Sequence, residues 1–64
     1  MRPLTSTEIE VLQLTAQGLS AKQIAHQKNR SKGTIETHRL NIYRKLQVKN
    51  ACEAVNVAKE KGLI

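Results

Sequence analysis

The fold of this chain is decided by residues 19–46, which read LSAKQIAHQKNRSKGTIETHRLNIYRKL. Ser20 has a side-chain oxygen suited to capping a helix, and Gln23 stands at the third helical position after it. Asn29-Arg30-Ser31 is typical of a turn, and its last residue supplies a fresh cap. The pattern therefore predicts a short helix over about 21–28 and a longer one over 32–46, separated by a tight turn.

The same start and stop signals flank this stretch on both sides. Thr5 and Glu8 have the spacing of a capping box, which predicts a helix over about 6–17 ended by Gly18. Asn50 caps a last helix over about 51–61, which Gly62 closes. No segment alternates apolar and polar residues over the length that a strand needs. We therefore predict an all-α, four-helix domain with a helix-turn-helix layout that occupies residues 1–64 as a single unit.

Length and composition limit what the chain can do. Its 64 residues allow one small domain, and a 39% apolar fraction without Phe or Trp suits short packed helices. The single cysteine, Cys52, cannot form an internal disulfide, and no apolar run is long enough to cross a bilayer. We therefore expect no membrane partner and a location in the reducing cytoplasm.

Positive charge is concentrated in the middle of the chain. The formal net charge is +6, and eight of the 11 Lys and Arg residues lie from Lys22 to Lys49, together with one acid, Glu36. Such a patch favours a polyanionic partner, because each neutralised phosphate releases condensed counterions. From charge alone, an ordinary solvated basic surface explains the pattern equally well.

The helix expected over 32–46 has two chemically different faces. At about 100° per residue, Ile35, Ile42 and Leu46 form one apolar stripe, which must face the core. The opposite face carries side chains that can contact base edges in a DNA major groove. A leucine there either contacts a thymine methyl group or is simply exposed, and both interpretations stay open. The predicted base contacts are Glu36, Thr37, Leu40, Asn41 and Arg44.

Basic side chains from several segments flank this outward face. Phosphate contacts position a recognition helix without specifying a sequence. Taken singly, each of these cations is better explained by solvation, whereas DNA explains the set better. The predicted phosphate contacts are Lys22, Lys28, Arg30, Lys32, Lys45 and Lys49.

These residues also carry a family resemblance. From residue 4 to residue 64, without a gap, the chain resembles the LuxR (NarL/FixJ) DNA-binding domain of bacterial transcription regulators. The resemblance includes Leu4-Thr5, Glu8, Glu10-Val11-Leu12, Gly18, Ile24-Ala25, Thr34-Ile35, His38, Asn41-Ile42, Lys45-Leu46, Val48 and Gly62-Leu63-Ile64.

The resemblance implies a regulator that binds double-stranded DNA through its second and third helices and dimerises through its fourth. It implies base readers at Glu36, Thr37 and Leu40. It also implies phosphate contacts near Lys22, Lys32 and Lys45. RNA polymerase is a candidate partner, and an N-terminal regulatory domain is expected to be missing if the chain is an excised fragment.

Three positions depart from the family pattern. Thr7 stands where Arg is usual, and Lys28 and Arg30 replace apolar residues that normally pack beneath the turn. Because Lys28 projects into the apolar stripe of its helix, either its ammonium group reaches out of that stripe or the helix ends early. Extra phosphate contact by Lys28 and Arg30 is the functional interpretation of the change.

The last helix directs small apolar residues inward, and one valine lies at the edge of that stripe. For Val57, peripheral packing and a weak isologous dimer contact are both open. The family resemblance favours the second, so we predict a homodimer contact at Val57. The residues predicted to face the core are Ala51, Ala54, Val55 and Ala58.

Catalysis is not expected. His26, His38 and Cys52 lie on three different predicted helices without metal-ligand spacing, so we predict no enzyme, metal or cofactor. A helical adaptor for an acidic protein and a non-specific RNA binder remain as alternatives. RNA-reading modules usually stack bases on aromatic rings, and this chain offers only Tyr43.

Overall fold

Four helices account for most of residues 4–64, which the computed structural model describes; residues 1–3 of the predicted domain lie outside the described part. The helices are α1 (Ser6–Ala16), α2 (Ala21–Gln27), α3 (Lys32–Leu46) and α4 (Ala51–Glu60), and residues 4–64 contain no strand. The predicted all-α, four-helix architecture is confirmed. α1, α2 and α4 each end one residue earlier than expected, because Gln17, Lys28 and Lys61 act as C-caps.

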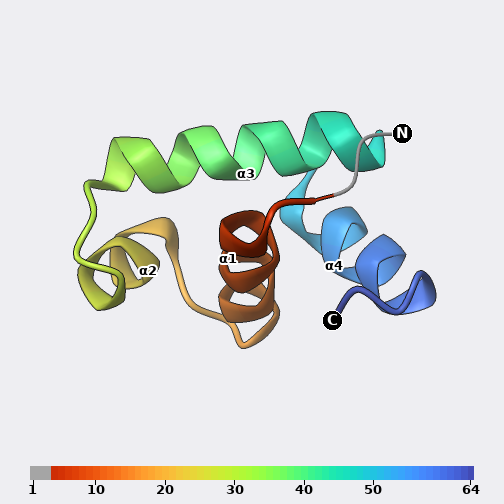
Figure 1. Ribbon diagram of the computed structural model, residues 1–64, viewed down its shortest axis with the longest axis horizontal. Coiled ribbons are helices and arrows are strands. Elements are labelled where there is room, and N and C mark those ends of the chain that lie inside the picture. The colour runs from red at the N-terminus through yellow and green to blue at the C-terminus, as the bar shows by residue number, and fades with distance from the viewer. Residues whose placement is uncertain (1–3) are drawn as a thin grey trace.

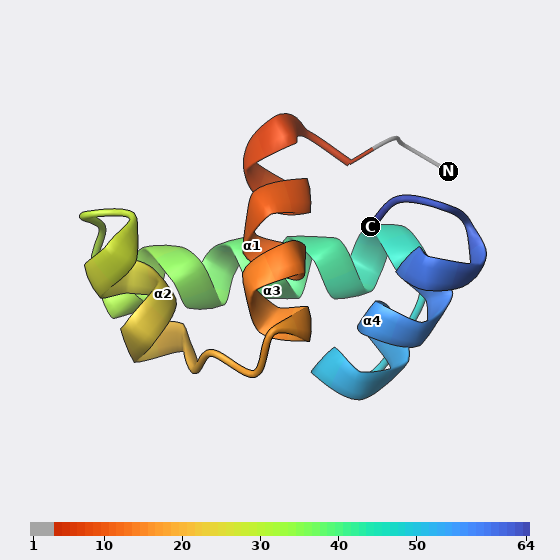
Figure 2. The same cartoon turned by 90° about the horizontal axis from the view of Figure 1, so that it is seen from below.

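α3 spans the molecule along one side (Figure 1). Its 15 residues correspond to a length of about 22 Å, compared with 28 Å for the longest dimension of the molecule. α2 lies beneath its N-terminal half, α1 crosses its middle, and α4 lies beneath its C-terminal end (Figures 1 and 2). All three helices lie on one side of α3, so its other side is left uncovered within the described residues.

Polar side chains fix where each helix begins. Thr5, Ser20, Ser31 and Asn50 each accept a hydrogen bond from the backbone amide three residues further along, at 2.9–3.2 Å. In α1 and α2 the bond is reciprocated, which completes two capping boxes. These contacts are local in sequence, which is why the sequence predicts all four starts.

Each helix ends in the same pair of reversed backbone bonds. A residue in the left-handed region lets its own amide and the amide of the following residue bond back to carbonyls of the last turn, as in a Schellman motif. These residues are Gly18, Asn29, Gln47 and Gly62, with φ of 92°, 56°, 57° and 72°. The two glycines were predicted as helix ends and Asn29 lies in the predicted turn, but the sequence did not predict the end at Gln47.

The core is small and aliphatic. α3 contributes Ile35, Ile42 and Leu46, which are at most 6% exposed, so the predicted inward stripe is confirmed. Ala51 and Val55 of α4 are only half-buried, in contrast to Ala54 and Ala58, because they lie towards the edge of its apolar side. The remaining core residues are Val11, Leu12, Ala21, Ile24, Ala25, Ala54 and Ala58.

Candidate nucleic-acid interface

The uncovered side of α3 carries the predicted base readers. Glu36, Thr37, Leu40 and Arg44 are exposed, and Asn41 is half-buried at the edge of the same face. Thr37 also donates its hydroxyl to the backbone carbonyl of Gly33 at 3.0 Å, which orients its side chain. The helix therefore presents a carboxylate, a hydroxyl, an amide and a guanidinium on one surface.

Leu40 differs from the rest of this surface. It is 54% exposed, and among residues 4–64 no other large apolar side chain is classed as exposed. Single leucines are often exposed on protein surfaces, so the position of Leu40 agrees both with plain solvent exposure and with an apolar contact to a partner.

The turn before α3 is held by its own backbone. The amide of Arg30 bonds to the carbonyl of Ala25 at 2.8 Å, and the left-handed Asn29 makes this reversal possible. Ser31 then caps α3 and hydrogen-bonds the hydroxyl of Thr34 at 2.8 Å. These contacts hold the turn in one conformation and so define the angle at which α3 leaves α2.

Four of the six predicted phosphate contacts are exposed and form no ion pair within the described residues. The described residues contain two ion pairs, and these four cations take part in neither of them. They lie in the first turn of α2, in the turn, at the start of α3 and in the loop after α3. These exposed cations are Lys22, Arg30, Lys32 and Lys49.

Lys28 is tied to α1 instead. Its ammonium group lies 2.5 Å from a carboxylate oxygen of Glu10, and the Lys28 side chain is only 20% exposed. Both possibilities raised by the sequence occur together: α2 ends before Lys28, and the ammonium reaches past the apolar stripe. The charge of Lys28 is thus paired within the domain.

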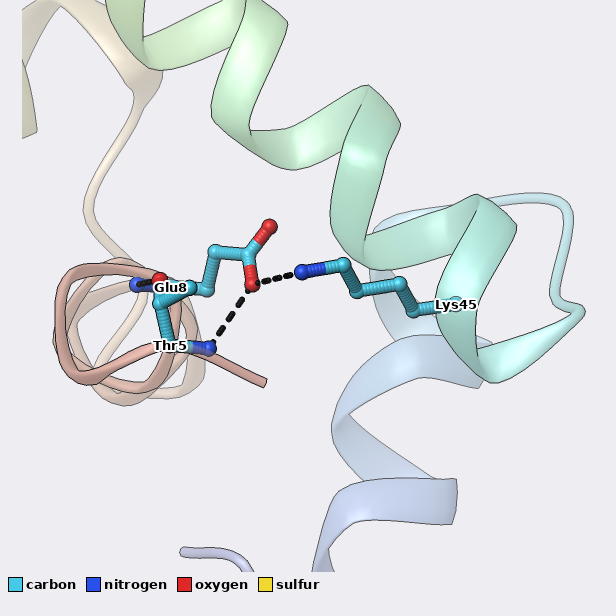
Figure 3. Close-up of polar contacts among 3 residues, drawn as sticks. All are labelled: Thr5, Glu8 and Lys45. Atoms are coloured by element: carbon cyan, nitrogen blue, oxygen red, sulfur yellow. Dashed lines mark hydrogen bonds and ion pairs between the residues drawn. The ribbon is translucent and has the colours of Figure 1, made fainter. Parts of the chain in front are cut away.

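Lys45 is also paired, with a carboxylate that sequence reasoning did not place in the core. Glu8 is 4% exposed, and its Oε1 accepts both the Lys45 ammonium at 2.6 Å and the Thr5 amide at 2.9 Å (Figure 3). Glu8 was predicted only as half of a capping box. Its second partner lies 37 positions away, so no local signal could have identified the pair.

The surroundings of Glu8 keep it ionised. Burial alone would raise the pKa of its carboxyl, but the Lys45 ammonium and the bonds from Thr5 outweigh burial and lower the pKa below 4.5. At neutral pH the pair therefore links the start of α1 to the end of α3, the helix that carries the predicted readers.

One further residue pair on α3 was not assigned to the interface from the sequence. Arg39 donates from Nε to the hydroxyl of Tyr43 at 3.2 Å, and both side chains are half-buried. With Glu36 and Leu40 they line a shallow hollow of about 220 Å³ on the flank of α3. The i, i+4 spacing of Arg39 and Tyr43 was a usable signal for their contact.

The residues considered for other roles are dispersed. His26 and Cys52 are exposed, His38 is half-buried, and no cluster of three or more potential metal ligands occurs among residues 4–64. Val57 is partly buried against the core. In the described part of the chain, no helix combines the length and apolar character needed to span a membrane.

A family model and the relatives of known sequence agree on the family of this chain. Residues 2–58 match the family described as bacterial regulatory proteins, luxR family. The chain is 45% identical over 60 residues to the uncharacterized response regulatory protein YgeK of Escherichia coli K12, covering 94% of this chain and 41% of that protein. It is also 45% identical over 60 residues to the transcriptional regulatory protein DesR of Bacillus subtilis, covering 94% of this chain and 30% of DesR.

A solved structure supports the same relationship. The crystal structure of the response regulator ChrA, from a heme-sensing two-component system, matches all of this chain with a TM-score of 0.96 and 41% sequence identity. The match covers 32% of ChrA, so this chain spans well under half the length of these relatives. The chain belongs to the luxR family of bacterial regulatory proteins, and its fold is the family's helix-turn-helix DNA-binding domain, not that of an enzyme.

Proposed function

We propose that this domain binds double-stranded DNA in a sequence-specific manner, with α3 lying in the major groove. The observation that carries the proposal is the uncovered side of α3, which presents hydrogen-bonding groups while the other three helices pack behind it (Figure 1). A major groove about 12 Å wide admits one such helix. The proposed base contacts are Glu36, Thr37, Leu40, Asn41 and Arg44.

Exposed cations would fix the position of α3 along the DNA by contacting phosphates. Lys22, Arg30, Lys32 and Lys49 come from different segments and are free to contact phosphates on both sides of the groove. Lys28 and Lys45 can contact phosphate only by sharing or leaving the carboxylates of Glu10 and Glu8. The four exposed cations therefore support the proposal more strongly than the two paired ones.

The domain is proposed to act as part of a transcription regulator in the cytoplasm. Its relatives are two or more times longer, which agrees with a separate regulatory domain on the natural protein. A weak isologous contact through α4, with Val57 at its edge, would pair two domains on two half-sites. RNA polymerase is a candidate partner of the DNA-bound regulator.

In vitro selection of random duplex DNA on the purified domain tests this proposal directly. We expect enrichment of a short motif, repeated with a spacing near one helical turn of about 10–10.5 base pairs if two domains bind together. Failure to enrich any duplex above background, under conditions where the domain is folded by circular dichroism, would refute sequence-specific binding.

Substitutions on α3 separate this function from its alternatives. Arg44→Ala and Thr37→Val should weaken binding to the selected duplex at least several-fold without loss of helicity, because both side chains are exposed. Lys59→Ala, an exposed change on α4, is the matched control. An adaptor for acidic proteins would tolerate the α3 changes, and an RNA binder would bind single-stranded RNA at least as tightly as duplex DNA.

A further inference from the structure

The hollow on the flank of α3 has an unusual lining for a surface so rich in charge. Leu40 and Tyr43 are among its lining residues, and both side chains carry apolar groups. Glu36 lies one helical turn before Leu40, and Arg39 is held by the hydroxyl of Tyr43 at 3.2 Å. The hollow therefore combines apolar side chains with the nearby carboxylate of Glu36, which can accept a hydrogen bond. The hydrogen bond between Arg39 and Tyr43 holds two of its lining side chains together.

The chemistry of base edges narrows what such a hollow can accept. In the major groove thymine alone among the four bases presents a methyl group, and cytosine presents an amino group without a neighbouring acceptor on the same base. A carboxylate accepts from the cytosine amino group but repels the acceptor atoms of thymine and guanine. Leu40 and Glu36 thus favour different pyrimidines.

The spacing of the two side chains agrees with neighbouring bases. Residues four apart on a helix lie about 5–6 Å from each other, and successive bases on one strand are about 3.4 Å apart. Glu36 and Leu40 can therefore reach two bases that are adjacent or separated by one position.

We propose that the hollow beside Leu40 takes the 5-methyl group of a thymine, and that Glu36 selects a cytosine one or two positions away. This inference rests on the proposed function and adds to it the identity of two bases in each half-site. Arg39 and Tyr43 act as positioning residues, because their bond keeps the wall of the hollow in place when DNA is absent.

The test replaces thymine by uracil, one position at a time, in the duplex obtained by selection. Uracil lacks only the methyl group, so the wild-type domain should lose about four-fold in affinity at one thymine per half-site, the effect of leaving one methyl group unburied. Leu40→Ala should bind more weakly and lose this sensitivity, whereas Leu40→Met should keep it. Leu40 is 54% exposed, so these variants should fold.

A second variant tests whether Glu36 selects cytosine. Glu36→Gln, which can donate as well as accept, should relax the preference for cytosine at one position by several-fold. Glu60→Gln, an exposed change on α4, should leave that preference unchanged.

The outcomes separate the two proposals. If a motif is enriched but every thymine tolerates uracil, or if Leu40→Ala keeps the wild-type sensitivity, the methyl contact is wrong while DNA binding stands. If the cytosine preference survives Glu36→Gln, the role of Glu36 is wrong. If no duplex is enriched, the proposed function fails and this inference fails with it.

Discussion

Lys45, in the last turn of α3, donates a hydrogen bond across 2.6 Å to Glu8, in the first turn of α1. The two residues are 37 positions apart, and the Glu8 side chain is almost fully buried. Removing one partner of such a pair leaves the other without its hydrogen bond. This contact therefore ties the proposed recognition helix to the body of the domain.

Glu8→Gln should destabilise the domain by about 1–2 kcal/mol, because Lys45 loses a charged partner while a glutamine can still complete the capping box. Urea unfolding at neutral pH measures the change. Glu60→Gln, exposed and outside both ion pairs, should change stability by less than about 0.5 kcal/mol. Equal stabilities of the Glu8 variant and the wild type would show that the pair contributes nothing.

The same carboxylate gives stability a defined pH dependence. The pKa of Glu8 is lower in the folded domain than its ordinary value of 4.5, so the folded state favours the ionised form. The stabilisation by ionised Glu8 is complete above pH 4.5 and is lost as the pH falls through the folded-state pKa. The difference in unfolding free energy between wild type and Glu8→Gln should therefore shrink as the pH falls below 4.5. A difference that grew there would contradict a lowered pKa for Glu8.

The Lys28–Glu10 pair should matter much less. Glu10 is 56% exposed, so water and salt screen the pair. A double-mutant cycle with Lys28→Met and Glu10→Gln should give a coupling energy below about 1 kcal/mol. A coupling energy well above this value would mean that the pair contributes substantially to holding α2 against α1.

Exposed cations should contribute to the salt dependence of DNA binding. Lys32→Ala should weaken binding to all duplexes similarly and reduce the slope of log K against log salt by about 1. Lys59→Ala should leave the slope unchanged, because this lysine lies on α4 and not beside the uncovered face of α3. A change of sequence preference in Lys32→Ala would instead indicate a base contact.

The division between what the sequence predicted and what it missed follows the range of the interactions. Ser20 and Ser31 cap helices through contacts three residues away, so the helix starts could be predicted locally. Ile35 and Ile42 repeat with the helical period, which identified the buried and exposed faces of α3. The outward position of the base readers followed from this, although their contacts with DNA stay predictions.

Contacts between distant segments could not be predicted in this way. The burial of Glu8 depends on where α3 ends relative to α1, and the pairing of Lys28 depends on how α2 meets Glu10. Both involve charged residues, for which exposure is the ordinary expectation. The sequence therefore assigned Lys28 and Lys45 to phosphate contacts without showing that each has a carboxylate partner in the domain.

The end of α3 offers a prediction about backbone conformation alone. Gln47 is exposed, so its side chain contributes little packing energy. Its φ of 57° places its backbone in the left-handed region, which glycine adopts without steric cost. Gln47→Gly should therefore stabilise the domain by up to about 1 kcal/mol, since relief of this strain exceeds the extra freedom of glycine in the unfolded chain.

Gln17 provides the matched control at the end of α1. It is also an exposed glutamine at a helix end, but its φ is −79°, an ordinary right-handed value. Gln17→Gly should therefore lower stability by about 0.5–1 kcal/mol, because glycine gains freedom in the unfolded chain without relieving strain in the folded one. Opposite signs for the two variants in urea unfolding would establish that left-handed backbone at Gln47 is strained. Destabilisation by both would mean that the Gln47 side chain makes a compensating contribution.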